Sequence, residues 1–233
     1  MEKVILSGST MAIVSNLTEN LESLKIDKFR NYLKTKWMGK KIILFSKIDS
    51  TNDFASSLER NIVLRKIKQR KIESIESILN SPQKLMQCFP QDILEKATPK
   101  SLNGVLILAE TQTFGRGRFK RKWLSPQGGL WFTLILIPKL QTNNPETKLD
   151  TCAFGKNLPK ITLIAAASIT QVLEKEYKIK TLIKWPNDIY YKNSNKNLKL
   201  GGILAECEKI EKDLFLNLGI GLNVNLDINQ LEE

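Results

Sequence analysis

The sequence predicts an α+β fold in which a mixed, largely antiparallel sheet is flanked by helices. Short apolar segments bounded by polar or glycine-containing turns recur along the chain, as expected for strands that follow one another in a sheet. Only residues 161–177 carry the apolar spacing of a long core helix. Strands in runs with few intervening helices argue against a doubly wound parallel sheet. With 233 residues, 42% of them hydrophobic, the chain can form one sizeable core.

The first part of the chain is predicted to contain an extension, a strand, a helix start and an insertion. Residues 1–39 are expected to form an N-terminal extension with an amphipathic helix around Leu17 to Leu33. The extension is too short for a complete DNA-binding module. The apolar residues 41–46 predict a strand, and the polar tetrad at 49–52 is typical of a turn and helix cap. Residues 59–101 are strongly charged and interrupted by prolines, so we expect a surface insertion there.

The second part is predicted to supply most of the sheet and the core helix, so that residues 40–233 form one domain. Further strands are expected at residues 105–109, 130–137, 181–185, 203–207 and 214–220. Residues 141–159 and 192–197 have the composition of loops. The buried face of the helix at 161–177 is expected to consist of Leu163, Ile164, Ala167, Val172 and Leu173.

Composition excludes several classes of protein. The chain has no histidine, which removes histidine general bases, histidine metal sites and serine–histidine triads. No apolar run reaches roughly 18 residues, so we expect no membrane span. Its three cysteines form no CxxC pair, and together with a poor secretory signal they predict reduced thiols in a cytoplasmic protein. The net charge of +12 favours anionic partners.

A basic, glycine-broken loop at residues 113–123 is the strongest functional signal. Arg116, Arg118 and Arg121 stand among glycines, where guanidinium forks and backbone amides can bind an anion. Trp123 follows directly and can cover an adenine ring. Taken alone, the loop also fits a solvated hairpin tip, or a nucleic-acid patch that acts with the basic run at 65–71.

Two polar segments at strand ends could complete such a site. Lys184 to Asp188 reads either as a Pro-Asn-Asp turn or, with Lys199, as a cluster in which lysines meet phosphates and a carboxylate holds Mg²⁺. Residues 219–225 read either as a bulged strand or as a segment that presents the Asn223 amide to a base edge.

In this order, the motifs resemble the catalytic domain of the biotin protein ligase family, also called biotin–[acetyl-CoA-carboxylase] ligase or holocarboxylase synthetase. The matched segments are Asp49–Asn52, Ala109–Gln112, Gly115–Trp123, Lys184–Asp188, Lys199–Glu206 and Gly219–Val224. Several ordered motifs are far more specific than any one of them. The resemblance implies the biotin/lipoate ligase fold, which is like that of class II aminoacyl-tRNA synthetases.

The resemblance also implies an enzyme with two half-reactions. Biotin and ATP, with Mg²⁺, would give biotinyl-5′-AMP and pyrophosphate. A lysine of a biotin carboxyl carrier domain, part of a biotin-dependent carboxylase, would then attack the mixed anhydride and release AMP. Such chemistry needs positioning and charge stabilisation and no enzyme nucleophile. The resemblance implies no nucleic-acid partner, and the sequence leaves open whether the chain forms a homodimer.

The resemblance assigns roles to residues of this sequence. The catalytic residues it implies are Lys199, Arg118 and Asp188, with Asp188 also near Mg²⁺. The implied biotin-binding residues are Ser50, Thr51, Asn52, Gln112, Arg116, Gly117, Arg118 and Lys199. The implied nucleotide-binding residues are Arg116, Arg118, Arg121, Trp123, Lys184, Asn187 and Asn223. The loop would close over the adenylate and exclude water.

The chain departs from the family pattern at several places. Lys120 stands where relatives often have glycine, and the segments from Asn52 to Gly104 and from Asp188 to Lys199 are extended. The small C-terminal β domain usual in relatives is expected to be absent, since the sequence ends at Glu233. A lipoate or octanoate ligase or transferase of the same fold, and a basic nucleic-acid-binding module, are the alternative functions.

Overall fold

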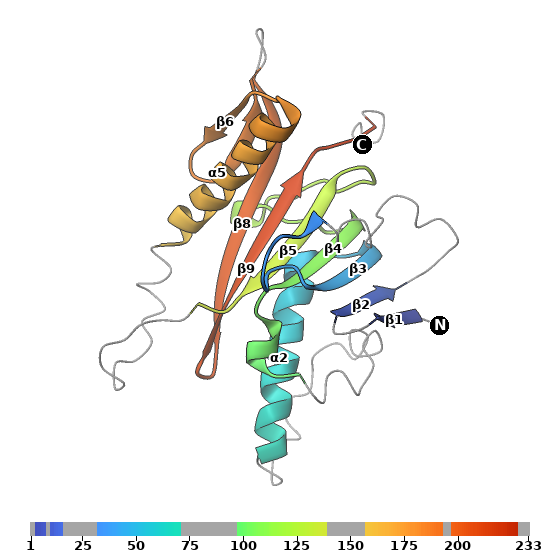
Figure 1. Cartoon of the computed structure of the whole chain (residues 1–233). Coiled ribbons are helices and arrows are strands. Elements are labelled where there is room, and N and C mark those ends of the chain that lie inside the picture. The colour runs from blue at the N-terminus through green and yellow to red at the C-terminus, as the bar shows by residue number, and fades with distance from the viewer. Residues whose placement is uncertain are drawn as a thin grey trace.

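The centre of the molecule is a nine-stranded sheet with the strand order β1-β2-β3-β4-β5-β9-β8-β7-β6 (Figure 1). The computed structural model describes residues 3–7, 10–15, 32–70, 97–138, 157–192 and 197–227. The strands are β1 (Lys3–Ser7), β2 (Thr10–Ser15), β3 (Lys41–Ile48), β4 (Val105–Gln112), β5 (Leu130–Leu136), β6 (Thr181–Lys184), β7 (Asp188–Tyr191), β8 (Leu198–Ile210) and β9 (Asp213–Leu222). The described helices are α2 (Thr51–Arg70), α5 (Leu158–Tyr177) and the 3-10 helices η2 (Pro99–Leu102) and η3 (Arg118–Lys120).

Strand pairing confirms the predicted mixed, largely antiparallel sheet. β3 runs parallel to both β2 and β4, and every other neighbouring pair is antiparallel. Each strand predicted from 41 onward is present, in β3, β4, β5, β6, β8 and β9. Three strands were not predicted. β1 and β2 lie within the expected N-terminal extension but belong to the sheet, with β2 paired to β3. β7 was missed because Pro186, Asn187 and Asp188 read as a turn.

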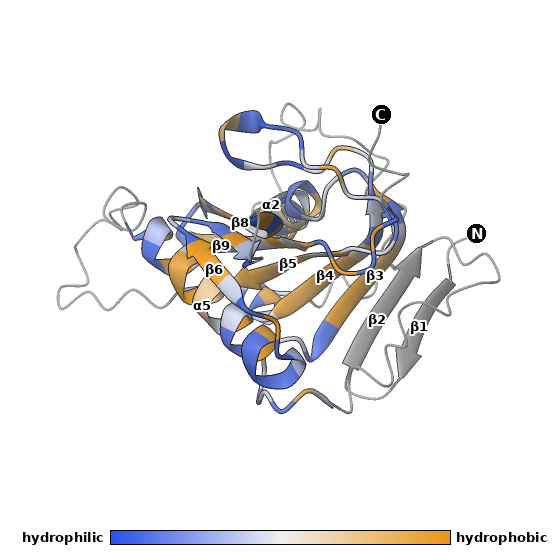
Figure 2. Ribbon diagram, turned by 90° about the horizontal axis from the view of Figure 1, so that it is seen from above, coloured by the Kyte–Doolittle hydropathy of each residue, from blue (hydrophilic) through white to orange (hydrophobic). Residues whose placement is uncertain are grey.

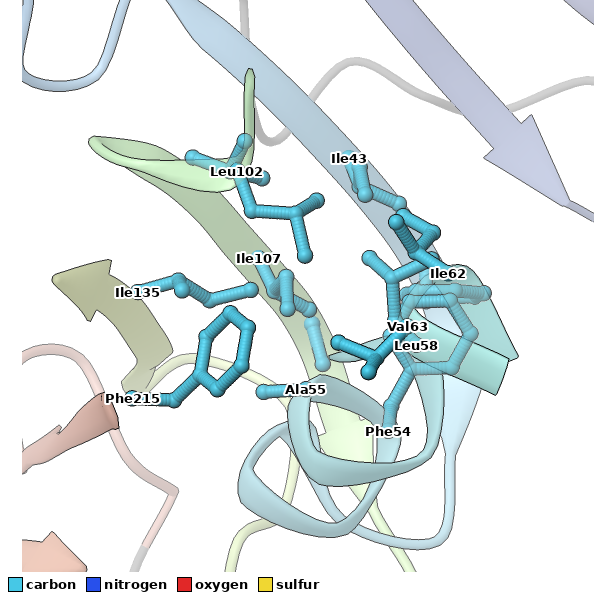
Figure 3. Close-up of a cluster of buried hydrophobic side chains, with 13 residues drawn as sticks. Ile43, Phe54, Ala55, Leu58, Ile62, Val63, Leu102, Ile107, Ile135 and Phe215 are labelled. Atoms are coloured by element: carbon cyan, nitrogen blue, oxygen red, sulfur yellow. The ribbon is translucent and has the colours of Figure 1, made fainter. Parts of the chain in front are cut away.

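The two α-helices cover opposite faces of the sheet (Figure 2). Alternate residues of one strand point to opposite faces, so Ile43 and Phe45 pack with α2, whereas Ile42 and Leu44 belong to the cluster that contains Ala166 of α5. Figure 3 shows the cluster on the α2 side, where Phe54 and Leu58 face the strand residue Ile107. The sheet is therefore buried on both faces, as its apolar strands require.

Helix α2 corrects the predicted surface insertion. Leu58, Ile62 and Val63 are at most 5% exposed and pack in the core, so residues 59–63 are not an insertion. Their spacing places them on one helix face. The charged residues that follow concealed this face, and α2 is therefore a second core helix besides the predicted one. Residues 71–96, the greater part of the predicted insertion, lie outside the described residues.

Helix α5 confirms the predicted helix but not the predicted buried face. Thr162, Ala166 and Thr170 are buried, whereas Ile164 and Val172 are 66% and 52% exposed. The prediction assumed that the largest apolar side chains of the helix would face the core. Instead, the buried residues are small and recur every four positions, which lets the helix lie close to the sheet. Leu163 and Ala167 are also exposed, and Leu173 is half-buried.

Three other expectations concern segments at the limits of what the structure describes. The amphipathic helix expected around Leu17 to Leu33 and the loop expected at 141–159 fall largely outside the described residues. Of the polar connection at 192–197, only Lys192 and Asn197 are described. No helix of the described chain is long and apolar enough to cross a membrane.

Candidate functional site

A cavity of about 200 Å³ lies between the N-terminus of α2, the basic loop after β4 and the strands β8 and β9. It brings together twelve of the residues predicted for the site: Ser50, Thr51, Asn52, Gln112, Arg116, Gly117, Arg118, Arg121, Trp123, Asn187, Asp188 and Lys199. The other two lie outside the lining. Lys184 faces the ring of Tyr190, and the Asn223 amide donates to the Lys199 carbonyl at 3.2 Å.

One end of the cavity is built from uncharged polar groups at the start of α2. The Thr51 amide donates to Gln112 Oε1 at 2.8 Å, and Gln112 Nε2 donates to Ser125 Oγ at 2.9 Å. The amide of Asp53 donates to Ser50 Oγ at 3.3 Å, a helix-cap arrangement that confirms the predicted cap. These bonds fix the direction of each donor and acceptor before a ligand arrives.

Asn52 is held at this end by three neighbours. Its Oδ1 accepts a hydrogen bond from Thr133, its Nδ2 donates to Glu206 Oε2 at 2.8 Å, and its amide lies against Gly219. A Cβ at position 219 would come 2.3 Å from Asn52 Oδ1, so only glycine fits there. A further polar residue, Thr51, has its hydroxyl 2.8 Å from that of Thr133.

The basic loop forms a small hairpin over the cavity. The Trp123 amide donates to the Gly115 carbonyl at 2.8 Å, and the Gly117 amide donates to the Arg121 carbonyl at 2.7 Å. At the tip, Phe119 and Lys120 have φ values of 56° and 58°, the left-handed region that favours glycine. Lys120 therefore holds a conformation that glycine would adopt without a Cβ penalty.

Arg116 does not reach into the cavity with a free guanidinium. Its Nε donates to Asp53 Oδ2 at 3.1 Å, and its Nη1 and Nη2 donate to Glu206 Oε1 and Oε2 at 3.0 and 2.9 Å. Partial burial opposes the charge of Arg116. The hydrogen bonds to Glu206 and Asp53, and the charges of those carboxylates, outweigh this and raise its pKa. Its side chain is thus occupied by carboxylates where the sequence predicted a biotin or phosphate ligand.

The other end of the cavity is cationic. Lys199 Nζ donates to Asp188 Oδ2 at 2.8 Å and lies 5.1 Å from the centre of the Trp123 ring. Arg118 Nη1 donates to Asn187 Oδ1 at 3.1 Å. Because Asn187 also donates to the Ile203 carbonyl, the turn before β7 holds Arg118 in place. These cations are arranged to receive an anion.

Trp123 closes the cationic end over two glycines. A Cβ at Gly202 would meet its ring at 3.2 Å, and a Cβ at Gly221 would come 2.7 Å from Trp123 Nε1. The Nε1 atom is buried and, among the described residues, has no hydrogen-bond partner. The glycines of β8 and β9 therefore make room for the indole ring.

The residues fit Mg²⁺ only in part. Asp188 supplies one carboxylate, and Lys199 already occupies one of its oxygens. Within the described chain there is no group of three or more histidine, cysteine, aspartate or glutamate side chains that could hold a metal. Protein side chains alone therefore make no complete metal cage here, although a carboxylate beside bound phosphates is a usual Mg²⁺ arrangement.

Sequence reasoning missed three residues that support the site and, in addition, one buried carboxyl in α2. Thr133 is a buried hydroxyl in the apolar strand β5, which was a readable signal. Glu206 was part of a matched motif but received no role, and Asp53, directly after the predicted helix cap at 49–52, received none either. The buried carboxyl in α2 is that of Glu59.

Glu59 introduces a titratable group beside the site. Burial, opposed by the hydrogen bond from Asn217 and reinforced by the charge of Glu208, raises the pKa of Glu59 to about 8. Asn217 Nδ2 lies 3.2 Å from Glu59 Oε2. Burial also raises the pKa of the Cys207 thiol. At neutral pH the Glu59 carboxyl is therefore mostly protonated.

Comparisons with known proteins identify relatives for most of the chain. The family model described as "Biotin/lipoate A/B protein ligase family" matches residues 75–225. The bifunctional ligase/repressor BirA of Bacillus subtilis (strain 168) is 36% identical over 141 residues, which are 60% of this chain and 38% of that protein. The human biotin–protein ligase is 25% identical over 228 residues, which are 96% of this chain and 24% of that protein.

A solved structure is also similar. It is the biotin protein ligase from Aquifex aeolicus in complex with biotin and ATP, with 29% identity and a TM-score of 0.45 over 79% of this chain and 53% of that one. The chain thus spans about half of that structure and between a quarter and two fifths of the curated relatives described above.

Proposed function

Because the chain belongs to the biotin/lipoate A/B protein ligase family, we propose that it carries the catalytic centre of a biotin protein ligase. The observation that carries the proposal is one cavity with uncharged polar groups at one end and cations at the other. Biotin has a polar, uncharged ureido ring at one end and a carboxylate at the other. A nucleotide phosphate must meet that carboxylate, so both anions belong at the cationic end.

The polar end is proposed to bind the ureido ring. Ser50, Thr51, Asn52 and Gln112 supply hydroxyl and amide groups that can donate to the ureido carbonyl and accept from its N–H groups. Because these side chains are already held by hydrogen bonds to the protein, little side-chain conformational entropy is lost when the ligand binds. Gly117 would let the loop backbone approach the bound biotin.

The cationic end is proposed to catalyse adenylation. A biotin carboxylate oxygen attacks the α-phosphorus of ATP, the bond to pyrophosphate breaks, and biotinyl-5′-AMP forms. Lys199 and Arg118 would stabilise the charge that grows on the α-phosphate oxygens, with Arg121 and Lys184 adding positive charge nearby. Trp123, Asn187 and Asn223 are proposed to contact the nucleotide.

The second half-reaction is proposed to use a biotin carboxyl carrier domain as partner. The neutral amine of a carrier lysine attacks the acyl carbon, a proton leaves the nitrogen, and AMP departs with the bonding electrons. Asp188 lies beside Lys199 and can orient the incoming amine through a charge-assisted hydrogen bond. Closure of the loop would keep water from the anhydride until the carrier arrives.

Mg²⁺ is proposed to arrive with ATP. Asp188 would be one of the ligands that hold it, and the nucleotide phosphates would supply others. The ion would neutralise charge on the leaving pyrophosphate. This arrangement is consistent with the single carboxylate at the cationic end of the cavity.

We propose that the protein is cytoplasmic, on the basis of its cysteines and its proposed substrates. Its three cysteines form no CxxC pair, and Cys207 is a free thiol. Free thiols persist in a reducing compartment, and ATP is available there to drive adenylation.

The polar end also favours biotin over lipoate. A dithiolane ring accepts and donates few hydrogen bonds, so it would gain little from the hydrogen-bonding capacity that Thr51, Asn52 and Gln112 offer to a ligand beyond their bonds to the protein. We therefore expect biotin to be activated and lipoic acid to be poorly activated, with a difference of about tenfold or more.

Mass spectrometry of the protein mixed with ATP, Mg²⁺ and either biotin or lipoic acid tests the proposal. The expected product is biotinyl-5′-AMP, with little lipoyl-AMP. A folded sample that forms lipoyl-AMP in preference would reassign the substrate, and one that forms neither adenylate while it binds DNA in a salt-sensitive manner would support the nucleic-acid alternative.

A further inference from the structure

An ion cluster behind the cavity ties the basic loop to the rest of the domain. Arg116 comes from the loop, Asp53 from the first turn of α2, and Glu206 from β8. We call these three residues the arginine latch. Because its members come from three segments far apart in the sequence, the latch holds the loop against both the helix and the sheet.

The charge of the latch argues against a phosphate at Arg116. One guanidinium stands between two carboxylates, and its Nε, Nη1 and Nη2 all donate to them. The cluster therefore carries one more negative charge than positive. A phosphate that approached Arg116 would be repelled by Asp53 and Glu206, whereas Arg118 bonds only a neutral amide in the described chain.

The latch also reaches the polar end of the cavity. Glu206 Oε2 accepts a hydrogen bond from Asn52 Nδ2 at 2.8 Å in addition to the one from Arg116. Asn52 Oδ1 is fixed by Thr133, so Glu206 and Thr133 together set the orientation of the Asn52 amide. Closure of the loop and the direction of a biotin-pocket donor thus depend on the same carboxylate.

We propose that Asp53 and Glu206 are positioning residues that latch the basic loop closed through Arg116 and orient Asn52 for its ligand. This inference rests on the proposed function for the ligand that the loop covers, but the latch itself is a property of the unliganded protein. Arg116 then holds the basic loop in place over the cavity, and the phosphate is bound by Arg118, Arg121 and Lys199.

The molecule supplies a matched control for the latch. Arg60 and Glu208 form a bidentate ion pair at 2.8 and 2.9 Å that joins α2 to β8, and neither of its hydrogen bonds involves the loop. The Glu208 side chain is 32% exposed, close to the 34% of Glu206. Glu206→Gln and Glu208→Gln therefore each remove one arginine–carboxylate pair made by β8, but only Glu206→Gln removes the pair with the loop.

Hydrogen–deuterium exchange of the unliganded protein measures the latch directly. In Asp53→Asn and Glu206→Gln we expect the amides of Gly117 and Trp123, which are hydrogen-bonded within the loop, to exchange about tenfold faster, as expected for loss of a charged hydrogen bond. Asp53 is 52% exposed, so Asp53→Asn should still fold. Glu208→Gln should change these amides less than twofold. Equal exchange in all three variants and the parent would overturn the proposal.

Ligand release separates the latch from a phosphate-binding role for Arg116. With the latch, Asp53→Asn and Glu206→Gln release biotin and biotinyl-5′-AMP about tenfold faster than Glu208→Gln, and combining either with Arg116→Gln adds little. If Arg116 instead binds phosphate, removal of a competing carboxylate would tighten ATP binding, which contradicts the proposal. A parent that binds no biotin would defeat the proposed function, while the exchange experiment would still decide the latch.

Discussion

The two ends of the cavity differ in how their side chains are held. At the polar end, Ser50, Thr51 and Asn52 are at most 4% exposed, and their side chains are hydrogen-bonded to the Asp53 amide, to Gln112 and to Glu206, respectively. At the cationic end the Lys199 side chain is 39% exposed and pairs with Asp188. Buried, satisfied groups are rigid, whereas exposed ion pairs are weak and exchange partners readily. The polar end is thus held in place in the unliganded structure, whereas we expect the cationic end to rearrange when a ligand binds.

The largest effect is expected at the cationic end. Lys199→Ala removes the cation that we propose meets the α-phosphate, so adenylation should fall by about a hundredfold to a thousandfold, while biotin affinity changes little and the fold survives. Pyrophosphate release in single-turnover experiments measures the loss. The control is Lys184→Ala, because Lys184 lies outside the cavity lining; a larger loss in that variant would transfer the main role to Lys184.

Loss of Arg118 should open the cationic end. Arg118→Gly removes the bond to Asn187 and one charge over the phosphate, so we expect the adenylate to escape about ten to a hundred times faster, an effect of about 1.4 to 2.7 kcal/mol. Escaped adenylate biotinylates unrelated lysines, which can be measured on a bystander protein such as albumin. Release as slow as in the parent would remove the closing role from Arg118.

Thr133→Val tests the polar end with almost no change of volume. It removes the hydroxyl that bonds Asn52 Oδ1 and leaves that acceptor buried, at a cost of about 1–3 kcal/mol. We expect biotin affinity to fall by about tenfold in calorimetry and ATP affinity to stay within twofold. Equal losses for both ligands would show that the two ends are not independent. Thr170→Val, on the opposite side of the sheet, is the control.

Glu59 should make stability depend on pH. Its pKa is raised from 4.5 to about 8 in the folded protein, so the folded state keeps a proton that the unfolded state loses between pH 4.5 and 8. Stability should therefore fall as pH rises through this window, by at most about 1.4 kcal/mol per pH unit. Glu59→Gln, which cannot titrate, should flatten the slope in urea unfolding at pH 5.5 and 7.5. The same slope in Glu59→Gln and in the exposed control Glu176→Gln would contradict the assignment.

The smallest effect is expected at the tip of the loop. Lys120 adopts a left-handed conformation, so Lys120→Gly should stabilise the domain by about 1 kcal/mol or less. Lys122 is the control, because its backbone forms an antiparallel β-bridge with that of Arg116 across the loop. Lys122→Gly should therefore not stabilise the domain. Thermal unfolding of both variants measures the difference. An unfolding temperature of Lys120→Gly no higher than that of Lys122→Gly would show that the left-handed conformation at Lys120 has no cost.

The sequence predicted the sheet well because its strands are apolar and bounded by clear turns. It predicted α2 poorly because charged residues in the second half of the helix concealed the buried face of Leu58, Ile62 and Val63. At the site, the motifs identified the residues that line the cavity. They could not show that Arg116 is held by Asp53 and Glu206, because that pairing depends on three segments meeting in space.

Isothermal titration with biotin, and separately with ATP, is the most direct test of the difference between the two ends. Because the polar end is preformed, the parent protein should bind biotin in the absence of nucleotide, and ATP should bind more tightly once biotin is present. A folded protein that binds ATP alone as tightly as with biotin, and shows no biotin binding without it, would contradict the account.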